Sequence, residues 1–199
     1  MKRSTTVSSA SAAIAAVALA LSGCGGSTSA NSPSASAATE APKHFAVVSA
    51  GSLEAMKAIP VPSDAVLDLT GRISRTNSGD GLTIDLATLE TLPIVSGSVF
   101  EPFVKKATTF SGVLLSDLLT AAGADGKASS VFITALDDYT WLLPIEVARS
   151  GEVLLATREN GKAIPIEKGG PIRIVFSDDS MSGKDSDSWV WSVRGMQVR

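Results

Sequence analysis

The chain has 199 residues and a formal net charge of −3, and 44% of its residues are hydrophobic. It contains one cysteine and one histidine. The acidic balance argues against binding to nucleic acid through a basic patch. A single cysteine excludes an internal disulfide, so a folded domain must be stable through its core alone.

The first 23 residues are typical of a secretory signal. Lys2 and Arg3 form a short basic start, and an apolar stretch follows over 12–21. That stretch is too short to span a bilayer as a stable helix. The tetrapeptide Leu-Ser-Gly-Cys that ends at Cys24 resembles the lipobox of bacterial lipoproteins. In those proteins a thioether joins a diacylglycerol to the cysteine, and cleavage makes the cysteine the mature N-terminus.

This resemblance implies a lipoprotein signal peptide over 1–23 and lipidation of Cys24. Two or more acyl chains would then hold the protein on the extracytoplasmic face of a bacterial membrane, in the cell envelope. Cleavage removes two positive charges and no negative one, so the net charge changes from −3 to −5. Lipidation leaves no thiol for catalysis or metal binding. The alternative is an ordinary secretory signal that happens to contain a cysteine.

Residues 24–60 are predicted to be the lipidated cysteine and a flexible tether. Gly25 to Pro42 is rich in Ser, Ala, Gly, Thr and Pro, which cannot repay the entropy of ordering. A coil of this length spans about 20 to 25 Å on average. His44 is interpreted as a solvated linker residue, so no Ser-His-Asp triad is expected. Ser52 is a candidate N-cap for two helical turns before the domain, 61–199.

Short strands interrupted by brief helices are predicted from Ala65 onward. The strands lie at 65–73, 82–85, 94–103, 131–136, 139–143, 153–157, 172–176 and 189–198. The helices lie at 86–92 with Asp85 as N-cap, at 114–122 with Gly123 as the stop, and at 144–149. Asn160-Gly161 is a hairpin signal. The lack of regular strand–helix alternation favours an α+β fold, a mixed β-sheet domain with short helices.

Four stretches of this region resemble the sulfite-oxidase-type oxidoreductase molybdopterin-binding domain. They are 66–71 with 84–89, 110–119, Asp137-Asp138-Tyr139, and Asn160-Gly161 followed by 169–175. The resemblance implies that fold. In catalytic members it also implies a molybdenum ion held by two pterin sulfurs and one protein cysteine, which exchanges oxygen and electrons with a small substrate such as sulfite.

The cysteine of that family falls between the strand after the 86–92 helix and the Ser111-Gly112-Val113 element. Here the interval 98–110 contains no cysteine, and hydroxyl or carboxylate oxygen is a poor replacement for thiolate. Inside the matching motifs, Lys168 and Arg173 are the candidates for gripping the pterin phosphate. For Arg173, pairing with an acidic neighbour on the sheet is the competing interpretation.

The expected export route also argues against a bound molybdenum cofactor. Molybdenum cofactors are generally inserted in the cytoplasm, so a loaded enzyme crosses the membrane already folded, through the twin-arginine route. Lys2-Arg3 followed by Ser4, Thr5, Thr6 and Val7 lacks the paired arginines and apolar residues that this route prefers. A chain threaded unfolded would arrive without the cofactor.

Two further groups of residues are candidate sites. Asp178, Asp179, Asp185 and Asp187 lie in one Ser- and Gly-rich loop. Trp189 stands where the EF-hand spacing requires a bidentate glutamate, so a solvated loop is the interpretation and no metal site is expected. Trp189 and Trp191 share one face of the predicted last strand and Trp141 lies on another. Such residues usually pack in a core, although an exposed pair would bind a partner or a flat ligand.

The sequence therefore predicts a membrane-anchored extracytoplasmic lipoprotein that lacks the molybdenum-ligating cysteine and binds a small ligand or an envelope protein. The alternative is a sulfite-oxidase-like molybdopterin oxidoreductase without a protein thiolate, in which the metal would face one of Ser98, Glu101, Thr108 or Thr109. A third possibility is a structural spacer. A concave, polar-lined pocket between the Ser111-Gly112 and Gly169-Gly170-Pro171 turns would argue against a spacer.

Overall fold

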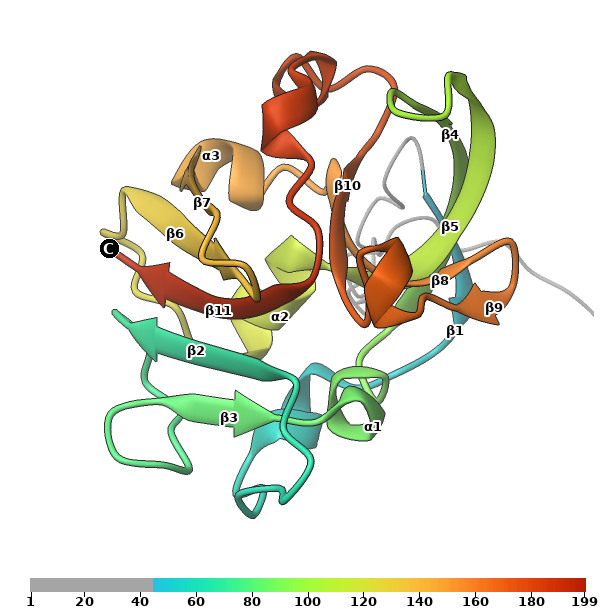
Figure 1. The fold of residues 1–199 in the computed structure, drawn as a ribbon. Coiled ribbons are helices and arrows are strands. Elements are labelled where there is room, and N and C mark those ends of the chain that lie inside the picture. The colour runs from blue at the N-terminus through green and yellow to red at the C-terminus, as the bar shows by residue number, and fades with distance from the viewer. Residues whose placement is uncertain (1–44) are drawn as a thin grey trace, which may run out of the picture. The chain divides into compact units, whose positions relative to one another are not determined.

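The computed structural model describes residues 45–199, which belong to one unit of the chain, 39–199. The predicted signal peptide, Cys24 and His44 lie outside the described residues. Two β-sheets share one hydrophobic core, with short helices beside them (Figure 1). The predicted α+β fold, a mixed β-sheet domain with short helices, is confirmed.

The first sheet has six strands, all paired antiparallel. In spatial order these are β1 (Ala46–Ser49), β4 (Ile94–Glu101), β5 (Lys106–Leu114), β8 (Val153–Glu159) and β10 (Arg173–Phe176), with β9 (Lys162–Ala163) added to β8. The second sheet has the order β3 (Leu82–Ile84), β2 (Leu67–Gly71), β11 (Val193–Val198), β6 (Ser130–Ala135) and β7 (Thr140–Pro144). In this sheet β2 and β11 run parallel, and the other neighbours run antiparallel.

Residues 45–60 pack with the domain, ahead of the boundary at residue 61 that the sequence predicts. β1 pairs with β4, and the side chains of Phe45 and Met56 are each only 1% exposed. Burial of such a side chain stabilises a fold by about 1.5–3 kcal/mol, which is enough to draw this segment onto the domain. Ser52 caps the 3₁₀ helix η1 (Leu53–Met56), as predicted, by accepting a hydrogen bond from Glu54 N at 3.2 Å.

The short helices carry the predicted signals. Asp85 caps α1 (Leu86–Leu89), and its carboxylate accepts a hydrogen bond from Thr88 N at 2.6 Å. Three leucines of α2 (Leu115–Ala121) lie in the core with at most 1% exposure. α3 (Ile145–Ala148) follows Pro144, where the sequence places a helical turn. Local capping and helical spacing therefore located these elements correctly.

The long strand β5 was not predicted, although it lies at the centre of the first sheet. It pairs with β4 from Lys106 to Val113 and with β8 from Phe110 to Leu114. The register to β8 shifts between Ser111 and Gly112. A Cβ atom added to Gly112 would lie 2.0 Å from the Leu155 carbonyl oxygen. Only glycine allows β5 and β8 to approach this closely.

We predict that Gly112→Ala destabilises the protein by about 2 kcal/mol or more, because the added methyl group meets rigid backbone rather than a flexible side chain. Urea unfolding followed by circular dichroism measures the difference. Gly126→Ala is the matched control, since no atom lies within 4 Å of the added Cβ. Equal stability of the two variants would contradict the close approach.

The connection from β10 to β11 differs from the prediction of one strand over 189–198. It forms two 3₁₀ helices, η3 (Ser182–Lys184) and η4 (Ser186–Ser188), and β11 begins only at Val193. Asp185 caps η4 by accepting from Asp187 N at 3.0 Å. Figure 1 shows this connection, in red, crossing from the first sheet to the second. Trp189 and Trp191 therefore belong to the crossing segment, and not to the strand.

Glu90 fastens the end of α1 to β8. Its carboxylate accepts hydrogen bonds from the Thr157 hydroxyl at 2.7 Å and from Arg158 Nη2 at 2.8 Å. Burial acts to raise the pKa of Glu90, but the hydrogen bonds from Arg158 and Thr157 outweigh it and hold the pKa below the ordinary value of 4.5. The charged form of Glu90 is therefore the one that stabilises this contact.

A carboxylate whose folded pKa is lowered adds stability above its unfolded pKa, and this contribution is lost as the pH falls through 4.5 toward the folded value. We predict that Glu90→Gln reduces the loss of stability in that acid window. Urea midpoints measured from neutral pH down through 4.5 test this expectation. The control Glu146→Gln changes an exposed carboxylate in the first turn of α3, and an identical effect of both variants would contradict the role of Glu90.

Among the described residues, no helix has the length and apolar character needed to cross a membrane.

Candidate functional site

A cleft of about 260 Å³ opens where the two sheets and the crossing segment meet. Phe103 comes from the turn between β4 and β5, and Ala135, Asp137 and Tyr139 come from the end of β6 and the turn that follows it. The crossing segment completes the lining with Ser186, Asp187, Trp189 and Trp191. Four aromatic rings and two carboxylates therefore line one cleft.

Hydrogen bonds hold the walls of the cleft together. The Tyr139 hydroxyl donates to the Asp187 carbonyl oxygen at 2.9 Å, which ties the β6–β7 turn to η4. The Trp189 indole nitrogen donates to the Gly183 carbonyl oxygen at 2.8 Å, and the ring is 4% exposed. The rings of Phe103 and Trp191 meet edge to face, with 5.0 Å between centroids. Trp191 is 37% and Tyr139 is 41% exposed, so both remain accessible.

The electrostatic character of the cleft is negative. Asp137 and Asp187 are both exposed, and no lysine or arginine is among the lining residues. Partial burial raises the pKa of Tyr139, and the charges of Asp187 and Asp185 raise it further. These carboxylates disfavour a negative phenolate, and by the same physics they disfavour any anion in the cleft.

A buried ion pair lies behind Trp191. Arg173 Nη2 stands 3.1 Å from Glu101 Oε1, and these side chains are 4% and 3% exposed. Arg173 Nη1 lies 3.7 Å from Glu159 Oε2. The guanidinium carbon is 4.3 Å from the Trp191 ring centroid and 5.4 Å from that of Phe110. Burial lowers the pKa of Arg173, against the opposing effect of Glu101 and Glu159, and an arginine of this kind stays protonated.

Glu101 also shapes the turn that carries Phe103. Its second carboxylate oxygen accepts a hydrogen bond from Val104 N at 2.6 Å, and its carbonyl oxygen accepts from Lys105 N at 2.8 Å. One residue thus closes the β4–β5 turn and neutralises Arg173. The Nε atom of Arg173 is buried without a hydrogen-bond partner. The stability of this buried charge therefore depends more strongly on the carboxylates of Glu101 and Glu159.

The two candidates for phosphate binding lie apart from the cleft lining. Arg173 is paired with acidic neighbours on the sheet, which is the competing interpretation that the sequence left open. Lys168 is exposed at the end of η2 (Ile166–Lys168). A phosphate group would reach Arg173 only by displacing Glu101 or Trp191.

The four oxygen-bearing residues proposed to face a metal do not line the cleft. Glu101 is engaged with Arg173, and Thr108 is 2% exposed. Ser98 and Thr109 face each other across β4 and β5 as a register pair and are exposed. Phe103 is the member of the interval 98–110 that reaches the cleft. The role of Phe103 is not apparent from the sequence, because its position depends on how the turn folds.

The Gly169-Gly170-Pro171 turn serves packing. Trp191 lies 2.8–2.9 Å from the place where a Cβ of Gly169 would stand, and Gly169 has a φ of 84°. Pro171 lines a separate cleft that includes neither Ser111 nor Gly112. The cleft lined by Trp191 includes no residue of either turn. Glycine at 169 allows Trp191 to settle against the turn.

The acidic loop has structural contacts. Asp178 accepts a hydrogen bond from Phe100 N at 2.7 Å, which joins the loop to the β4–β5 hairpin, and Asp185 caps η4. Within residues 45–199, no group of three or more histidine, cysteine, aspartate or glutamate side chains is placed to hold a metal ion.

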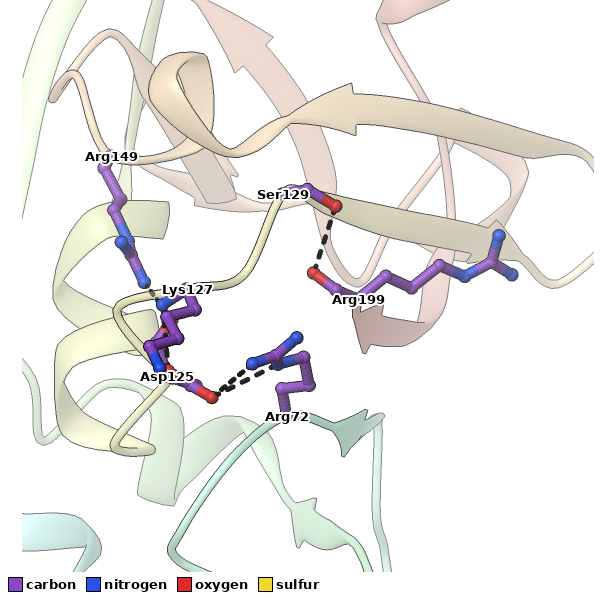
Figure 2. A network of polar contacts seen from close by, with 6 residues as sticks. All are labelled: Arg72, Asp125, Lys127, Ser129, Arg149 and Arg199. Atoms are coloured by element: carbon purple, nitrogen blue, oxygen red, sulfur yellow. Dashed lines mark hydrogen bonds and ion pairs between the residues drawn. The ribbon is translucent and has the colours of Figure 1, made fainter.

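A second polar cluster is visible in Figure 2, and it shares no residue with the cleft. Arg72 donates to Asp125 Oδ2 through Nη2 at 2.6 Å, and Lys127 N donates to Asp125 Oδ1 at 2.8 Å. Arg149 donates to the Asp125 carbonyl oxygen at 2.9 Å. The hydrogen bond from Lys127 N and the charge of Arg72 lower the pKa of Asp125. These hydrogen bonds hold the loop after α2 in place, and Asp125 has its partners within the cluster.

Comparison with known proteins identifies the fold. Residues 85–195 match the model of the oxidoreductase molybdopterin binding domain, which covers more than half of the chain. The chain therefore belongs to the oxidoreductase molybdopterin-binding domain family. No curated protein matches the chain. The match spans the β4–β5 hairpin, the β6–β7 turn and the crossing segment, which are the elements that build the cleft.

Among solved structures, the chain resembles the sulfane dehydrogenase SoxCD from Paracoccus pantotrophus. The two share 20% sequence identity with a TM-score of 0.54. The alignment covers 71% of this chain and 40% of that chain. At this identity the likeness supports the fold alone, and this chain corresponds to less than half of the larger protein.

The residues present do not fit a molybdopterin centre of the usual kind. The interval 98–110, in which the family resemblance implies the metal-binding cysteine, contains no cysteine. The cleft beside this interval presents carboxylates to an anionic pterin phosphate, and Arg173 is neutralised by Glu101 and Glu159. Both the metal and the phosphate would therefore lack favourable partners.

We predict that Glu101→Gln destabilises the protein by about 3 kcal/mol, because Arg173 would keep only the more distant Glu159 as a charged partner. Urea unfolding measures the difference. Asp138→Asn is the matched control, since it breaks an exposed pair with Arg194 and should cost less than about 1 kcal/mol. A Glu101→Gln variant as stable as the control would show that the buried pair does not hold the site.

Proposed function

We propose that this protein is a lipid-anchored extracytoplasmic lipoprotein that uses a molybdopterin-binding-type fold to bind a small ligand or an envelope protein, without a molybdenum centre. The single observation that carries the proposal is the buried ion pair between Glu101 and Arg173. Glu101 lies at the end of β4, beside the β4–β5 turn and within the interval in which the family resemblance places the cysteine.

The anchoring part of the proposal is supported by the sequence. The basic start, the short apolar stretch and Leu-Ser-Gly-Cys follow one another in the order of a lipoprotein signal. Lipid on Cys24 would place the domain at the extracytoplasmic surface of a bacterial membrane, at the end of a tether of about 20 to 25 Å. A ligand or partner would then be met in the cell envelope.

The binding part is supported by the cleft. Aromatic side chains and a few fixed polar groups in a concave site are the usual makeup of a ligand pocket. The Tyr139–Asp187 hydrogen bond holds two walls of this cleft in place. A structural spacer has no need for exposed Trp191 and Tyr139 rings beside each other in a concavity.

The alternative function is a sulfite-oxidase-like, molybdopterin-dependent oxidoreductase in which no protein thiolate holds the metal. Membership of the oxidoreductase molybdopterin-binding domain family favours it. It requires an oxygen donor from Ser98, Glu101, Thr108 or Thr109. Of these, Glu101 borders the turn that carries the cleft residue Phe103, and it is already paired with Arg173.

Metal analysis of the full chain purified from its own host separates the two functions. We expect molybdenum far below one atom per chain, because the donor set is unsuited to it. A molybdenum enzyme purified in parallel from the same cells controls for cofactor supply. Stoichiometric molybdenum would overturn the proposal in favour of the oxidoreductase.

Mass spectrometry of the mature N-terminus tests the anchor. We expect a chain that begins at Cys24 and carries acyl groups. A Cys24→Ser variant should release the domain from the membrane fraction, since the lipid is the proposed attachment. An unmodified Cys24, or a mature chain that begins elsewhere, would remove the anchor from the account.

A further inference from the structure

The cleft is lined by a combination of groups that selects for charge. Phe103, Tyr139, Trp189 and Trp191 supply aromatic rings, and Asp137 of the β6–β7 turn and Asp187 of η4 supply carboxylates. The ring of an aromatic residue carries negative charge on its face, which attracts a cation. Rings and carboxylates together therefore favour the same kind of ligand.

The strongest polar donors of these rings are already engaged. The Tyr139 hydroxyl and the Trp189 indole N–H both donate to backbone carbonyl oxygens, of Asp187 and Gly183. Asp137 accepts a hydrogen bond from Tyr139 N at 3.1 Å through one oxygen, which fixes its side chain at the rim. The cleft therefore presents mainly hydrogen-bond acceptors and aromatic rings to a ligand, and few hydrogen-bond donors. The bonds described above hold these groups in place.

The positive charge of Arg173 does not oppose the selection of a positively charged ligand. Arg173 lies behind Trp191, 4.3 Å from the ring centroid, but it is balanced by Glu101 and Glu159 and buried away from the cleft. Arg194 pairs with Asp138 at 2.5 Å and is not part of the lining. The net effect at the cleft is negative, in agreement with the raised pKa of Tyr139.

We propose that this cleft binds a small organic cation with a quaternary or protonated amine, seated between the aromatic rings and neutralised by Asp137 and Asp187. The proposal deepens the proposed function, on which it rests. A volume of about 260 Å³ lies just below the range of about 300 to 1,000 Å³ for drug-sized ligands, so the ligand is small.

Isothermal titration calorimetry of the full chain in detergent, with choline as the probe, tests the proposal. The matched ligand is 3,3-dimethylbutan-1-ol, which has the same shape as choline without the charge. We expect saturable binding of choline that weakens with added salt, and much weaker binding of the neutral alcohol. Inorganic sulfate should not bind in the cleft.

Variants assign the binding to the cleft. Asp187→Asn and Asp137→Asn should each weaken choline binding about two- to fivefold, the effect of losing one exposed charge partner. The double variant should weaken it about tenfold if the two sites act independently. Asp138→Asn is the matched control, because it removes the same charge from the same turn at a residue outside the cleft lining. It should leave the affinity unchanged within a factor of about two.

Three outcomes would overturn the proposal. These are equal binding of choline and its neutral isostere, equal loss in the Asp138→Asn control, and no saturable binding of choline below about 10 mM, beyond which general attraction to an acidic surface suffices. If a molybdenum-free protein does not bind choline, this inference is wrong and the proposed function is unaffected. Stoichiometric molybdenum would instead contradict the proposed function.

Discussion

The candidate site depends on the buried pair between Glu101 and Arg173. Two charges removed from water are stable together only when each neutralises the other and their remaining hydrogen bonds are met. Glu101 meets this condition by closing the β4–β5 turn through Val104 N. Arg173 lies between carboxylates and aromatic rings and meets it only in part, since its Nε atom is buried without a hydrogen-bond partner. The pair links β4 to β10 and supports Trp191 from behind. The position of Phe103 and the wall formed by Trp191 both follow from it.

The fold of this protein is that of its family, whereas the proposed function differs from the chemistry of the family's catalytic members. The chain belongs to the oxidoreductase molybdopterin-binding domain family, and its two sheets and their connections remain. A fold fixes where loops meet, while the side chains on those loops decide what binds there. Here the meeting place of the β4–β5 turn, the β6–β7 turn and the crossing segment carries rings and carboxylates. Exposed Asp137 and Asp187 make it suited to cations and unsuited to the anionic phosphate of a pterin.

Sequence patterns located the elements whose signals are local. Asp85 capped its helix and Asn160-Gly161 formed its turn because each signal acts within a few residues. The strand β5 was missed because Gly112, which breaks the alternation, is explained only by the approach of the Leu155 carbonyl oxygen. The partner of Arg173 lies 72 residues away at Glu101, so the sequence could name both interpretations of Arg173 without choosing. The cleft was missed as a unit, since its walls come from three separate segments.

We propose that this protein has the Glu101–Arg173 ion pair and an acidic aromatic cleft in place of a metal centre. A crystal structure of the protein purified from its own host, with data collected at the molybdenum absorption edge, tests this most directly. The account predicts Arg173 in contact with Glu101 and no anomalous scattering beside the β4–β5 turn. A strong anomalous peak there, with Glu101 turned away from Arg173 toward the metal, would contradict it.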